Sequence, residues 1–287
     1  MAYSRHMSNT TTHASLALAN SHYENFPVAS ALLPMRLRKP IGLIYSFARQ
    51  ADDFADEGDL IPEQRLALLD GFRQELDHIA TGKPAETEFF RTLSDMTAAH
   101  QLPLQPFHDL LDAFSQDVVK TRYQDFCEVM DYCRRSANPI GRLLLHLYGE
   151  ATPRNIGYSD AICSSLQIIN FLQDVNVDYQ KNRIYFPLDE MKKYRISEQQ
   201  IARGDASGTW SLFMQFEIER ARKLLQSGAP LGLALKGRIG LEMRMIIAGG
   251  ETILRKLHQS RGDVFNQRPV LKPWDWAAML FKALRAK

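Results

Sequence analysis

One apolar helix with a polar stripe constrains the fold of this chain more than any other feature of its sequence. Residues 159–179 carry apolar side chains on several sides, as in a helix buried at the centre of a domain. Spacings of three, four and four place four polar residues on one face: Gln167, Asn170, Asp174 and Asp178. Buried carboxylates need a metal ion, a bound cation or an aqueous cavity. The structural alternative is a network of ion pairs closed by an arginine such as Arg183.

A second acidic cluster lies upstream, at the end of the first expected helix. That helix is expected to start at Pro40, because a proline in the first turn needs no N–H, and to stop near Gly58. Four residues stack on one of its faces, with Asp53 beside them: Tyr45, Arg49, Asp52 and Asp56. Carboxylates this close repel unless a cation neutralises them, and Mg²⁺ suits such oxygens while also binding phosphate. A solvated acidic helix end is the alternative.

The two acidic helices, facing each other, would form a magnesium-filled cleft with room for a diphosphate. Three basic residues beside the carboxylates, Arg49, Lys181 and Arg183, are the expected diphosphate contacts. The planar fork of arginine matches phosphate oxygens in two-point contact. For each residue alone a surface ion pair is the simpler interpretation, and only their position beside both acidic clusters favours the diphosphate.

The rest of the chain predicts an all-α fold in a single domain. No internal repeat or low-complexity linker interrupts residues 21–265, and the longer segments have helical periodicity. Residues 183–186 are rich in β-formers, but this run is short and ends at Pro187, so a loop is expected there and almost no sheet anywhere. Further helices are expected over 63–80, 86–99, 106–120, 124–148 with a bend at Pro139, 190–202, 210–227 and 231–260.

Composition limits the class of partner. Thirty-five Lys and Arg residues against 33 Asp and Glu residues leave a net charge of +2, so no overall field favours nucleic acid, and none is expected as a partner. No stretch approaches the roughly 20 apolar residues that span a bilayer. Cys127, Cys133 and Cys163 match neither a disulfide framework nor a zinc spacing, so a reducing cytoplasm is the expected location.

The two ends of the chain are expected to differ from its middle. Residues 1–20 are rich in Ser, Thr, Asn and Ala and are expected to form a flexible leader, followed by an all-α domain over residues 21–270. Residues 271–287 mix aromatic, aliphatic and basic side chains in an amphipathic pattern that suits peripheral contact with the inner face of a membrane. Docking of this tail against the protein's own core stays open as the alternative. No feature of the sequence predicts the oligomeric state.

Several segments resemble the squalene/phytoene synthase family. They are residues 22–26, 44–56, 167–178 and 182–187. The resemblance covers roughly residues 21–270, and two aspartate motifs in this order and at this distance are highly specific. It implies an α-helical isoprenoid synthase bundle with a central cavity. It also implies a set of aspartates that hold Mg²⁺ and the substrate diphosphate: Asp52, Asp53, Asp56, Asp174 and Asp178.

The same resemblance implies roles for further residues. Tyr132 matches a family tyrosine near the reacting carbon, and with the amides of Gln167 and Asn170 it forms the expected catalytic set. A buried structural tyrosine is the alternative for Tyr132. Six residues match positions that contact the substrate: His22, Asn25, Phe26, Tyr45, Arg49 and Arg183.

Two segments depart from the usual family pattern, residues 22–30 and residues 132–141. Both departures resemble the hydroxysqualene synthase branch of bacterial hopanoid biosynthesis. The resemblance implies that enzymes of this branch act as carbon–oxygen lyases. With Mg²⁺ they convert presqualene diphosphate and water to hydroxysqualene and diphosphate, through a carbocation that an apolar cavity shields. Two alternatives stay open. One is head-to-head condensation of two prenyl diphosphates to presqualene diphosphate or phytoene by a prenyl transferase, and the other is a catalytically silent, helical lipid-binding protein.

Overall fold

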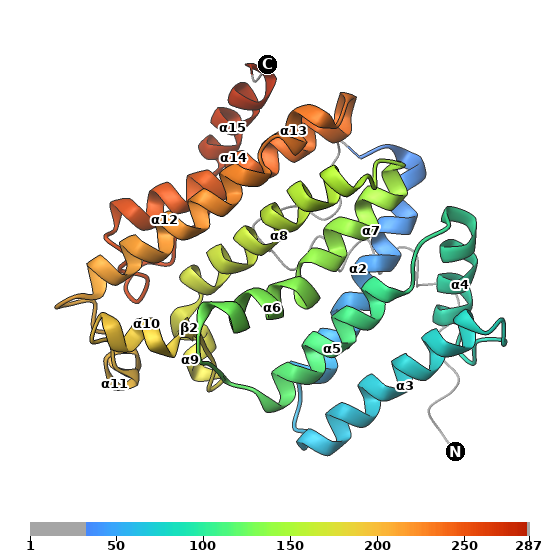
Figure 1. Ribbon diagram of the computed structural model, residues 1–287, viewed down its shortest axis with the longest axis horizontal. Helices are drawn as coiled ribbons and strands as arrows, with labels where there is room; N and C mark the ends of the chain where they lie inside the picture. The colour runs from blue at the N-terminus through green and yellow to red at the C-terminus, as the bar shows by residue number, and fades with distance from the viewer. Residues whose placement is uncertain (1–32, 286–287) are drawn as a thin grey trace.

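Helices form nearly all of this structure, a computed structural model that describes residues 33–285 (Figure 1). The prediction of an all-α fold with almost no sheet is confirmed. The first half contains α2 (Met35–Asp56), α3 (Pro62–Ala80), α4 (Glu88–His100), α5 (Gln105–Val119), α6 (Phe126–Ser136) and α7 (Asn138–Tyr148). The second half contains α8 (Pro153–Gln173), α9 (Val175–Gln180), α10 (Leu188–Lys193), α11 (Glu198–Ala202), α12 (Trp210–Gly228), α13 (Leu231–Ala234), α14 (Gly237–Gln259) and α15 (Pro273–Arg285).

A short parallel sheet connects the two halves. The prediction of a loop over residues 183–186 is wrong, because β2 (Ile184–Pro187) pairs with β1 (Arg122–Tyr123). The Ile184 N–H donates to the Thr121 carbonyl at 3.0 Å. Ile184 and Phe186 of β2 are buried on either side of the half-buried Tyr185, and this burial favours an extended strand although Pro187, also buried, ends it. The sheet holds Arg183, the residue before β2, beside the segment that follows α5.

Several helices begin or break at positions other than those predicted. Helix α2 begins at Met35, so the prediction that Pro40 opens it is wrong, and Pro40 lies buried inside the helix. Good helix formers in residues 35–39 extend the first turn, and the fixed φ of proline suits a helix at the cost of one backbone hydrogen bond. The helix predicted over 159–179 begins earlier, at Pro153 after the capping side chain of Thr152, and it breaks at Asp174.

Three other predicted helices are each divided in two. The bend predicted at Pro139 is a break at Ala137 between α6 and α7, which leaves Pro139 in the first turn of α7. Helices α13 and α14 are separated before Gly237, whose φ of +60° is a left-handed conformation that favours glycine. The segment predicted as one helix over 190–202 forms α10 and α11.

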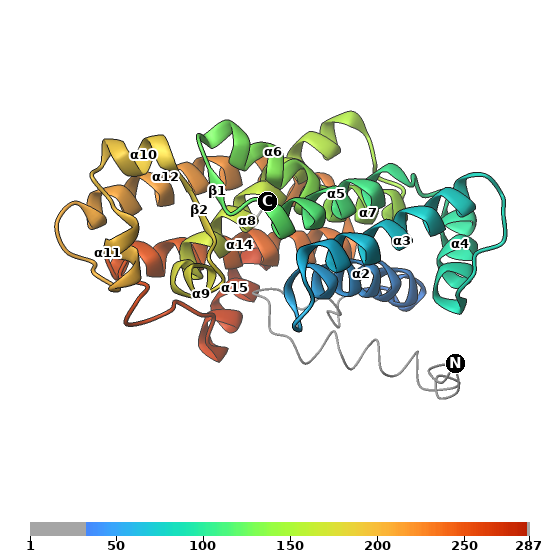
Figure 2. The ribbon, with the colours of Figure 1, turned by 90° about the horizontal axis from the view of Figure 1, so that it is seen from below.

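The two acidic helices belong to two different hydrophobic cores. One core is formed by α2, α3, α4, α5 and α7 and contains Phe47, Phe90 and Phe107. The other is formed mainly by α6, α8, α12, α14 and β2 and contains Tyr132, Phe171 and Trp210. Figure 2 shows the helices of both cores in one elongated body. The aspartates of α2 and α9 therefore lie where the two cores meet.

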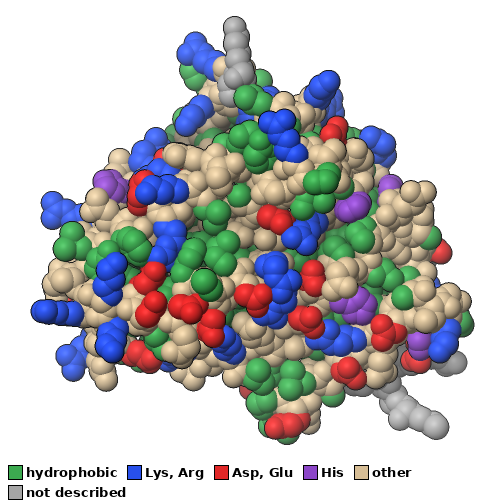
Figure 3. Space-filling view, viewed as in Figure 1, with side chains coloured by type: hydrophobic (Ala, Val, Ile, Leu, Met, Phe, Trp, Pro, Cys, Tyr) green, Lys and Arg blue, Asp and Glu red, His purple; other side chains and the backbone are tan. Residues whose placement is uncertain are grey.

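The surface and the ends of the described chain add three facts. On the face in Figure 3, acidic and basic side chains lie interleaved, which fits the net charge of +2. Among residues 33–285, no helix is both long and apolar enough to cross a bilayer. The predicted leader over 1–20 and the predicted substrate contacts His22, Asn25 and Phe26 lie outside the described residues.

Candidate active site

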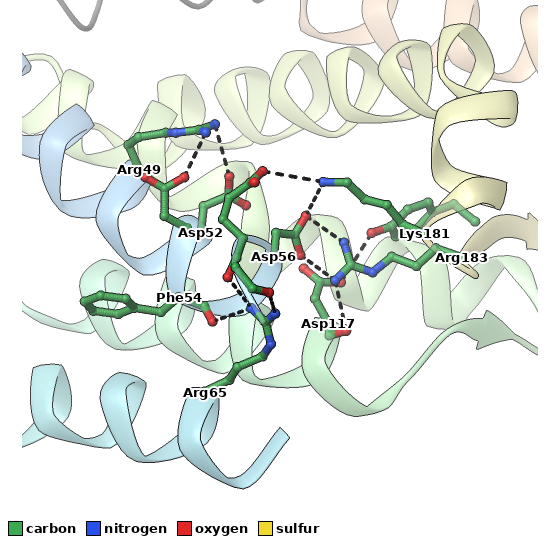
Figure 4. A network of polar contacts seen from close by, with 12 residues as sticks. Arg49, Asp52, Phe54, Asp56, Arg65, Asp117, Lys181 and Arg183 are labelled. Atoms are coloured by element: carbon green, nitrogen blue, oxygen red, sulfur yellow. Dashed lines mark hydrogen bonds and ion pairs between the residues drawn. The ribbon is translucent and has the colours of Figure 1, made fainter. Parts of the chain in front are cut away.

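Helix α3 fixes the end of α2, where the first aspartate cluster lies. The Arg65 guanidinium donates to the carbonyls of Phe54 and Glu57 at 3.0 Å and to that of Gly58 at 2.7 Å (Figure 4). A helix leaves its last carbonyls without partners inside the helix, and Arg65 satisfies that of Phe54 while also holding the two residues that follow the helix. The sequence analysis missed Arg65, because an arginine near the start of the next helix has no spacing that links it to the cluster.

Two of the cluster's carboxylates pair with Arg49 within α2. The Arg49 guanidinium lies 3.4 Å from Asp52 and 2.8 Å from Asp53 Oδ1. The predicted alignment of Arg49 with these carboxylates on the helix is therefore observed. Asp53 Oδ1 is buried, and within the described residues its contact with Arg49 lacks the geometry of a hydrogen bond. This oxygen keeps a lone pair that a cation would satisfy.

Asp56 contacts residues that follow the second acidic helix. Lys181 Nζ lies 3.0 Å from Asp56 Oδ2, and Arg183 donates to both Asp56 oxygens, at 2.9 and 2.5 Å (Figure 4). Burial opposes ionisation of Asp56, but the hydrogen bonds and charges of Arg183 and Lys181 outweigh it and lower the pKa of this carboxyl group. These contacts join the two motifs across 125 and 127 residues of chain.

The second motif is arranged around the helix break at Asp174. The Asp178 N–H donates to the Asp174 carbonyl at 2.8 Å, so the two carboxylates still lie one helical turn apart. Arg268 holds Asp174 in a two-point contact at 2.5 and 3.1 Å. Burial raises the pKa of Asp178 to about 7, and the charge of Asp174 adds to this effect against the opposing charges of Arg183 and Lys181. A bound cation would relieve this cost of ionising Asp178.

The ion pairs agree in part with the structural alternative from the sequence. An arginine network does close around the carboxylates, and Arg183 belongs to it, but Arg183 pairs with Asp56 of the first motif. Asp174 pairs instead with Arg268, which the sequence analysis did not assign to the site. The only feature of the sequence that pointed to Arg268 was its position inside the segment that resembles the family, residues 21–270.

The residues fit Mg²⁺ in one specific way. Within residues 33–285, no three carboxylate, imidazole or thiolate side chains are grouped closely enough to hold a metal ion. Mg²⁺ commonly takes only one or two carboxylates and fills its other positions with water and phosphate oxygens. The carboxylates of each motif supply that number of hard oxygen ligands, and the buried Asp53 Oδ1 is available to one more cation. The donor set therefore fits Mg²⁺ that arrives with a diphosphate.

An aromatic cluster lies beside the ion pairs. Tyr132 is buried, and its hydroxyl donates to Asp117 Oδ2 at 2.6 Å. Tyr185 stacks on Phe171 with 3.8 Å between ring centroids and 4° between ring planes. The rings of Tyr132 and Tyr185 have their centroids 5.5 Å apart. The predicted catalytic residue Tyr132 thus belongs to a packed wall of aromatic rings.

Asp117 was missed from the sequence, although a signal was present. It lies on α5 three residues after Phe114 and four after Ala113, on the buried face of that helix. A carboxylate on an apolar face is uncommon and points to a specific partner. Burial raises the pKa of Asp117 to about 6, although hydrogen bonds from Tyr132 and Tyr185 favour its ionised form.

A small cavity lies between the ion pairs and the aromatic wall. Its volume is about 10 Å³, which is close to the minimum that holds one water molecule. Its lining includes Asp178, Arg183, Phe171 and Tyr185. Two larger hollows, of about 500 and 450 Å³, lie along α12, and neither is lined by an aspartate of the two motifs. The chemistry of the lining, rather than size, therefore marks the small cavity as part of the site.

The other predicted residues of the described chain lie on the same two helices. Tyr45 is half-buried on α2. Gln167 and Asn170 are half-buried on α8, about two turns and one turn before the break at Asp174, respectively. The predicted polar stripe of α8 is therefore neither fully exposed nor sealed in the core.

Sequence comparisons find relatives over nearly the whole chain. Residues 19–275 match the squalene/phytoene synthase family. The chain is 37% identical to the hydroxysqualene synthase of Rhodopseudomonas palustris, over 92% of this chain and 89% of that protein. It is 36% identical to the hydroxysqualene synthase of Zymomonas mobilis, over 83% of this chain and 80% of that protein. It is also 30% identical to the phytoene synthase of Arthrospira platensis, over 88% of this chain and 85% of that protein.

Solved structures show the same fold. A squalene synthase from Alicyclobacillus acidocaldarius superposes with a TM-score of 0.79 at 32% identity, covering 87% of this chain and 93% of that one. A dehydrosqualene synthase in complex with a ligand superposes with a TM-score of 0.80 at 19% identity, over 95% of this chain and 94% of that one, and shows the likeness of fold alone. The expected isoprenoid synthase fold is confirmed.

Proposed function

Because the chain belongs to the squalene/phytoene synthase family, we propose that it converts presqualene diphosphate and water to hydroxysqualene and diphosphate in a Mg²⁺-dependent reaction. The activity is that of a lyase that breaks a carbon–oxygen bond. One observation carries the proposal. The two aspartate motifs meet through Lys181 and Arg183, directly beside a buried aromatic wall that contains Tyr132. A diphosphate leaving group and a carbocation need these two environments next to each other.

The charged side of the site would hold the diphosphate and its metal. Mg²⁺ would bind to carboxylates of both motifs, Asp52, Asp53, Asp56, Asp174 and Asp178, and would neutralise the charge that develops on the leaving diphosphate. Arg49, Arg183 and Lys181 now neutralise carboxylates of this set. Arg49, Arg183 and Lys181 would be free to contact the phosphate oxygens once the carboxylates were neutralised by the metal. In the free protein, the side chains proposed to bind the diphosphate are therefore held in ion pairs with the aspartates.

The apolar side of the site would receive the carbocation. The faces of Phe171, Tyr185 and Tyr132 carry negative quadrupole charge that stabilises a nearby cation. The cavity of about 10 Å³ against Phe171 and Tyr185 is large enough for the one water that ends the reaction. The phenol of Tyr132 and the amides of Gln167 and Asn170 would orient the attacking water, and Tyr45 with His22, Asn25 and Phe26 would contact the substrate.

Two alternatives rest on the same residues. A phytoene synthase relative at 30% identity favours the head-to-head condensation of two prenyl diphosphates, which uses the same metal ligands and diphosphate contacts. A silent lipid-binding protein would keep the fold but would have no need for two aspartate motifs brought together through Lys181 and Arg183. Product analysis separates all three.

The test is to incubate purified protein and Mg²⁺ separately with presqualene diphosphate and with farnesyl diphosphate, each with and without NADPH, and to identify the products by gas chromatography and mass spectrometry. We expect hydroxysqualene from presqualene diphosphate alone, without a requirement for NADPH. Presqualene diphosphate formed from farnesyl diphosphate would assign the chain to the condensing branch. A complete absence of products would favour the silent lipid-binding protein.

We also propose that α15 contacts a membrane surface, from which a lipid substrate would be drawn. One side of α15 packs on α14, with Met279 and Ala283 buried and an ion pair of 2.5 Å between Lys256 and Asp275. The other side exposes Trp274 by 65%, Phe281 by 58% and Leu284 by 64%. Figure 3 shows hydrophobic and basic side chains together at the top of the view, where Figure 1 shows α15.

Basic residues at the two ends of α15, Lys272 just before it and Arg285 at its last position, indicate which membrane the helix would contact. Lys272 lies over the Trp274 ring and Arg285 over the Phe281 ring, so cationic groups border the exposed apolar side chains. An amphipathic helix of this kind binds at the boundary between headgroups and acyl chains, and anionic headgroups strengthen binding. We therefore propose that α15 holds the protein peripherally on an anionic bilayer.

Co-sedimentation with lipid vesicles tests this surface. The wild-type protein is expected to sediment with vesicles that contain phosphatidylglycerol more than with vesicles of phosphatidylcholine alone. Phe281→Ser combined with Leu284→Ser should abolish the difference, while Leu212→Ser, at an exposed leucine of α12, should leave it intact. Equal sedimentation of the wild type and the double variant would contradict a role for α15.

A further inference from the structure

Asp117 is a buried carboxylate that the charged side of the site does not use. It lies on α5, is 6% exposed, and accepts hydrogen bonds from Tyr132 at 2.6 Å and from Tyr185 at 3.3 Å. Both hydroxyls belong to the aromatic wall. A bond of 2.6 Å between a hydroxyl and a carboxylate is at the short, strong end of the range for such pairs.

The nearest cationic side chain is directed elsewhere. Arg183 donates to the backbone carbonyl of Asp117 at 3.1 Å, and both of its terminal nitrogens donate to the Asp56 carboxylate. Asp117 has no ion pair among the described residues, unlike Asp56 and Asp174. The Asp117 carboxylate accepts hydrogen bonds from two phenols, which are weaker partners than a guanidinium, and Arg183 stabilises its charge without donating to it. A carboxylate in this position is well suited to receive a proton.

Several titratable and charged groups face Asp117 from the surrounding elements. Tyr132 comes from α6, Tyr123 from β1 and Tyr185 from β2. Arg183 is the residue before β2, and Asp56 comes from α2. Burial and the charge of Asp56 favour the protonated form of Asp117, while Tyr132, Tyr185 and Arg183 favour the ionised form. The balance raises the pKa of Asp117 to about 6, so the group is ionised at neutral pH and still binds a proton readily.

Tyr132 cannot provide or accept the proton by itself. Burial and the neighbouring charge of Asp117 raise the pKa of the Tyr132 phenol well above its ordinary value, so the phenolate form is not accessible at neutral pH. A neutral phenol accepts a proton only if it gives up its own at the same time. The hydrogen bond to Asp117 Oδ2 provides the path for that second transfer.

We propose that Asp117 takes up, through Tyr132, the proton that water loses when it captures the carbocation. This inference rests on the proposed function. The water oxygen forms the new bond to carbon, one water proton moves to the Tyr132 oxygen, and the Tyr132 proton moves to Asp117 Oδ2. The product keeps the hydroxyl, Tyr132 is restored as a phenol, and Asp117 is left as a neutral acid that later releases its proton to solvent. Asp117 acts as a positioning residue for Tyr132 and as the end of the relay.

The relay should affect the distribution of products more strongly than it affects the rate at which diphosphate leaves. Addition of water to a carbocation reverses until the bound water loses a proton. Without an acceptor, the cation is diverted to elimination or to recapture of diphosphate. The sharpest readout is therefore the fraction of consumed presqualene diphosphate that appears as hydroxysqualene, measured by mass spectrometry from pH 5 to pH 8.

Asp117→Asn is the first variant, because it keeps the size and an acceptor for Tyr132 but does not take up a proton. We expect the hydroxysqualene fraction to fall by about tenfold or more. In the wild type this fraction should rise with pH through about 6 as Asp117 ionises, whereas in the variant it should not change with pH. Asp109→Asn is the matched control, because Asp109 is also buried on α5 and bonds to Gln105 instead of a tyrosine.

A second variant keeps the test decisive if Asp117→Asn does not fold. Tyr132→Phe leaves the carboxylate in place and removes the relay, so it should lower the hydroxysqualene fraction by a similar factor. Where both variants fold, the double variant should be no worse than either one, since both interrupt the same path. A wild-type product fraction and pH profile in either single variant would overturn the relay. Absence of hydroxysqualene from the wild type would instead overturn the proposed function itself.

Discussion

At the scale of single residues, the site is a set of carboxylates that are neutralised by cations from distant parts of the chain. The spacing in the sequence identified the carboxylates correctly as two clusters, because helical periodicity is a local property. It placed Arg49 beside the first cluster, but it did not predict that Arg183 would pair with Asp56 or that Arg268 would pair with Asp174. Asp56 pairs with Arg183 across 127 residues and Asp174 with Arg268 across 94 residues, and such pairs depend on the tertiary fold.

Asp117 shows the same limit at one buried position. Its place on the apolar face of α5 could be predicted from the sequence, but the tyrosines that hold it come from α6 and from β2. The strand β2 was predicted to be a loop, so no argument from the sequence could have brought Tyr185 to Asp117.

Asp56→Asn tests the charged side of the site. The substitution removes a proposed metal ligand and leaves Lys181 and Arg183 without their shared carboxylate. We expect kcat for diphosphate release to fall on the order of 100-fold, because charge on the leaving group is no longer matched. Asp95→Asn, at an exposed position of α4, is the control and should keep wild-type kcat. A wild-type rate for Asp56→Asn would remove the first motif from the reaction.

At the scale of elements, periodicity predicted where helices exist better than where they break. The predicted helices over 63–80, 106–120 and 210–227 match α3, α5 and α12 within one or two residues. The break at Asp174 was missed, because the apolar pattern of α8 continues through Val175 and Val177. The break turns α9 so that Lys181 and Arg183 reach Asp56, and this geometry depends on packing between two cores that no local pattern encodes.

Alanine substitutions at two glycines test whether α8 and α12 must pack as closely as the structure shows. A Cβ atom at Gly228 would lie 2.4 Å from the Tyr158 carbonyl oxygen and 2.6 Å from Ile162, whereas at Gly157 of α8 it would meet nothing within 4 Å. Gly228→Ala should destabilise the protein by about 1–3 kcal/mol, because backbone must move. Gly157→Ala should stabilise it by up to about 1 kcal/mol, since alanine favours the helix.

Urea unfolding followed by circular dichroism measures both substitutions on α8 and α12. The opposite signs distinguish close helix packing from a general effect of alanine in helices. Equal and small effects of the two substitutions would show that α8 and α12 do not need the close approach at Gly228.

At the scale of the whole molecule, the fold class and the family were predictable, and the assembly of the site was not. Two aspartate motifs in a fixed order are enough to identify the family, because each is a contiguous pattern. The position of the site between two hydrophobic cores comes from how α7 packs with α8 and how α5 packs with α6. The sequence predicted the apolar face of each helix, but not how these faces group into two cores.

Ligand binding should couple to the stability of the whole chain, because the proposed site bridges the two cores. Mg²⁺ and inorganic diphosphate added together at about 100 times their Kd should raise Tm by roughly 5 °C or more, and either one alone should raise it much less. Differential scanning calorimetry measures the shifts, and Asp174→Asn should remove the joint effect. An undiminished shift in that variant would place the ligand elsewhere.

The most direct test of the account is the source of oxygen in the product. The wild-type protein, Mg²⁺ and presqualene diphosphate are incubated in ¹⁸O-labelled water, and the alcohol product is examined by mass spectrometry. Ionisation followed by capture of water predicts hydroxysqualene that carries ¹⁸O, because the carbon–oxygen bond of the substrate breaks. An alcohol without the label would mean that water attacks phosphorus instead, and it would contradict the carbocation, the role of the aromatic wall and the relay through Tyr132.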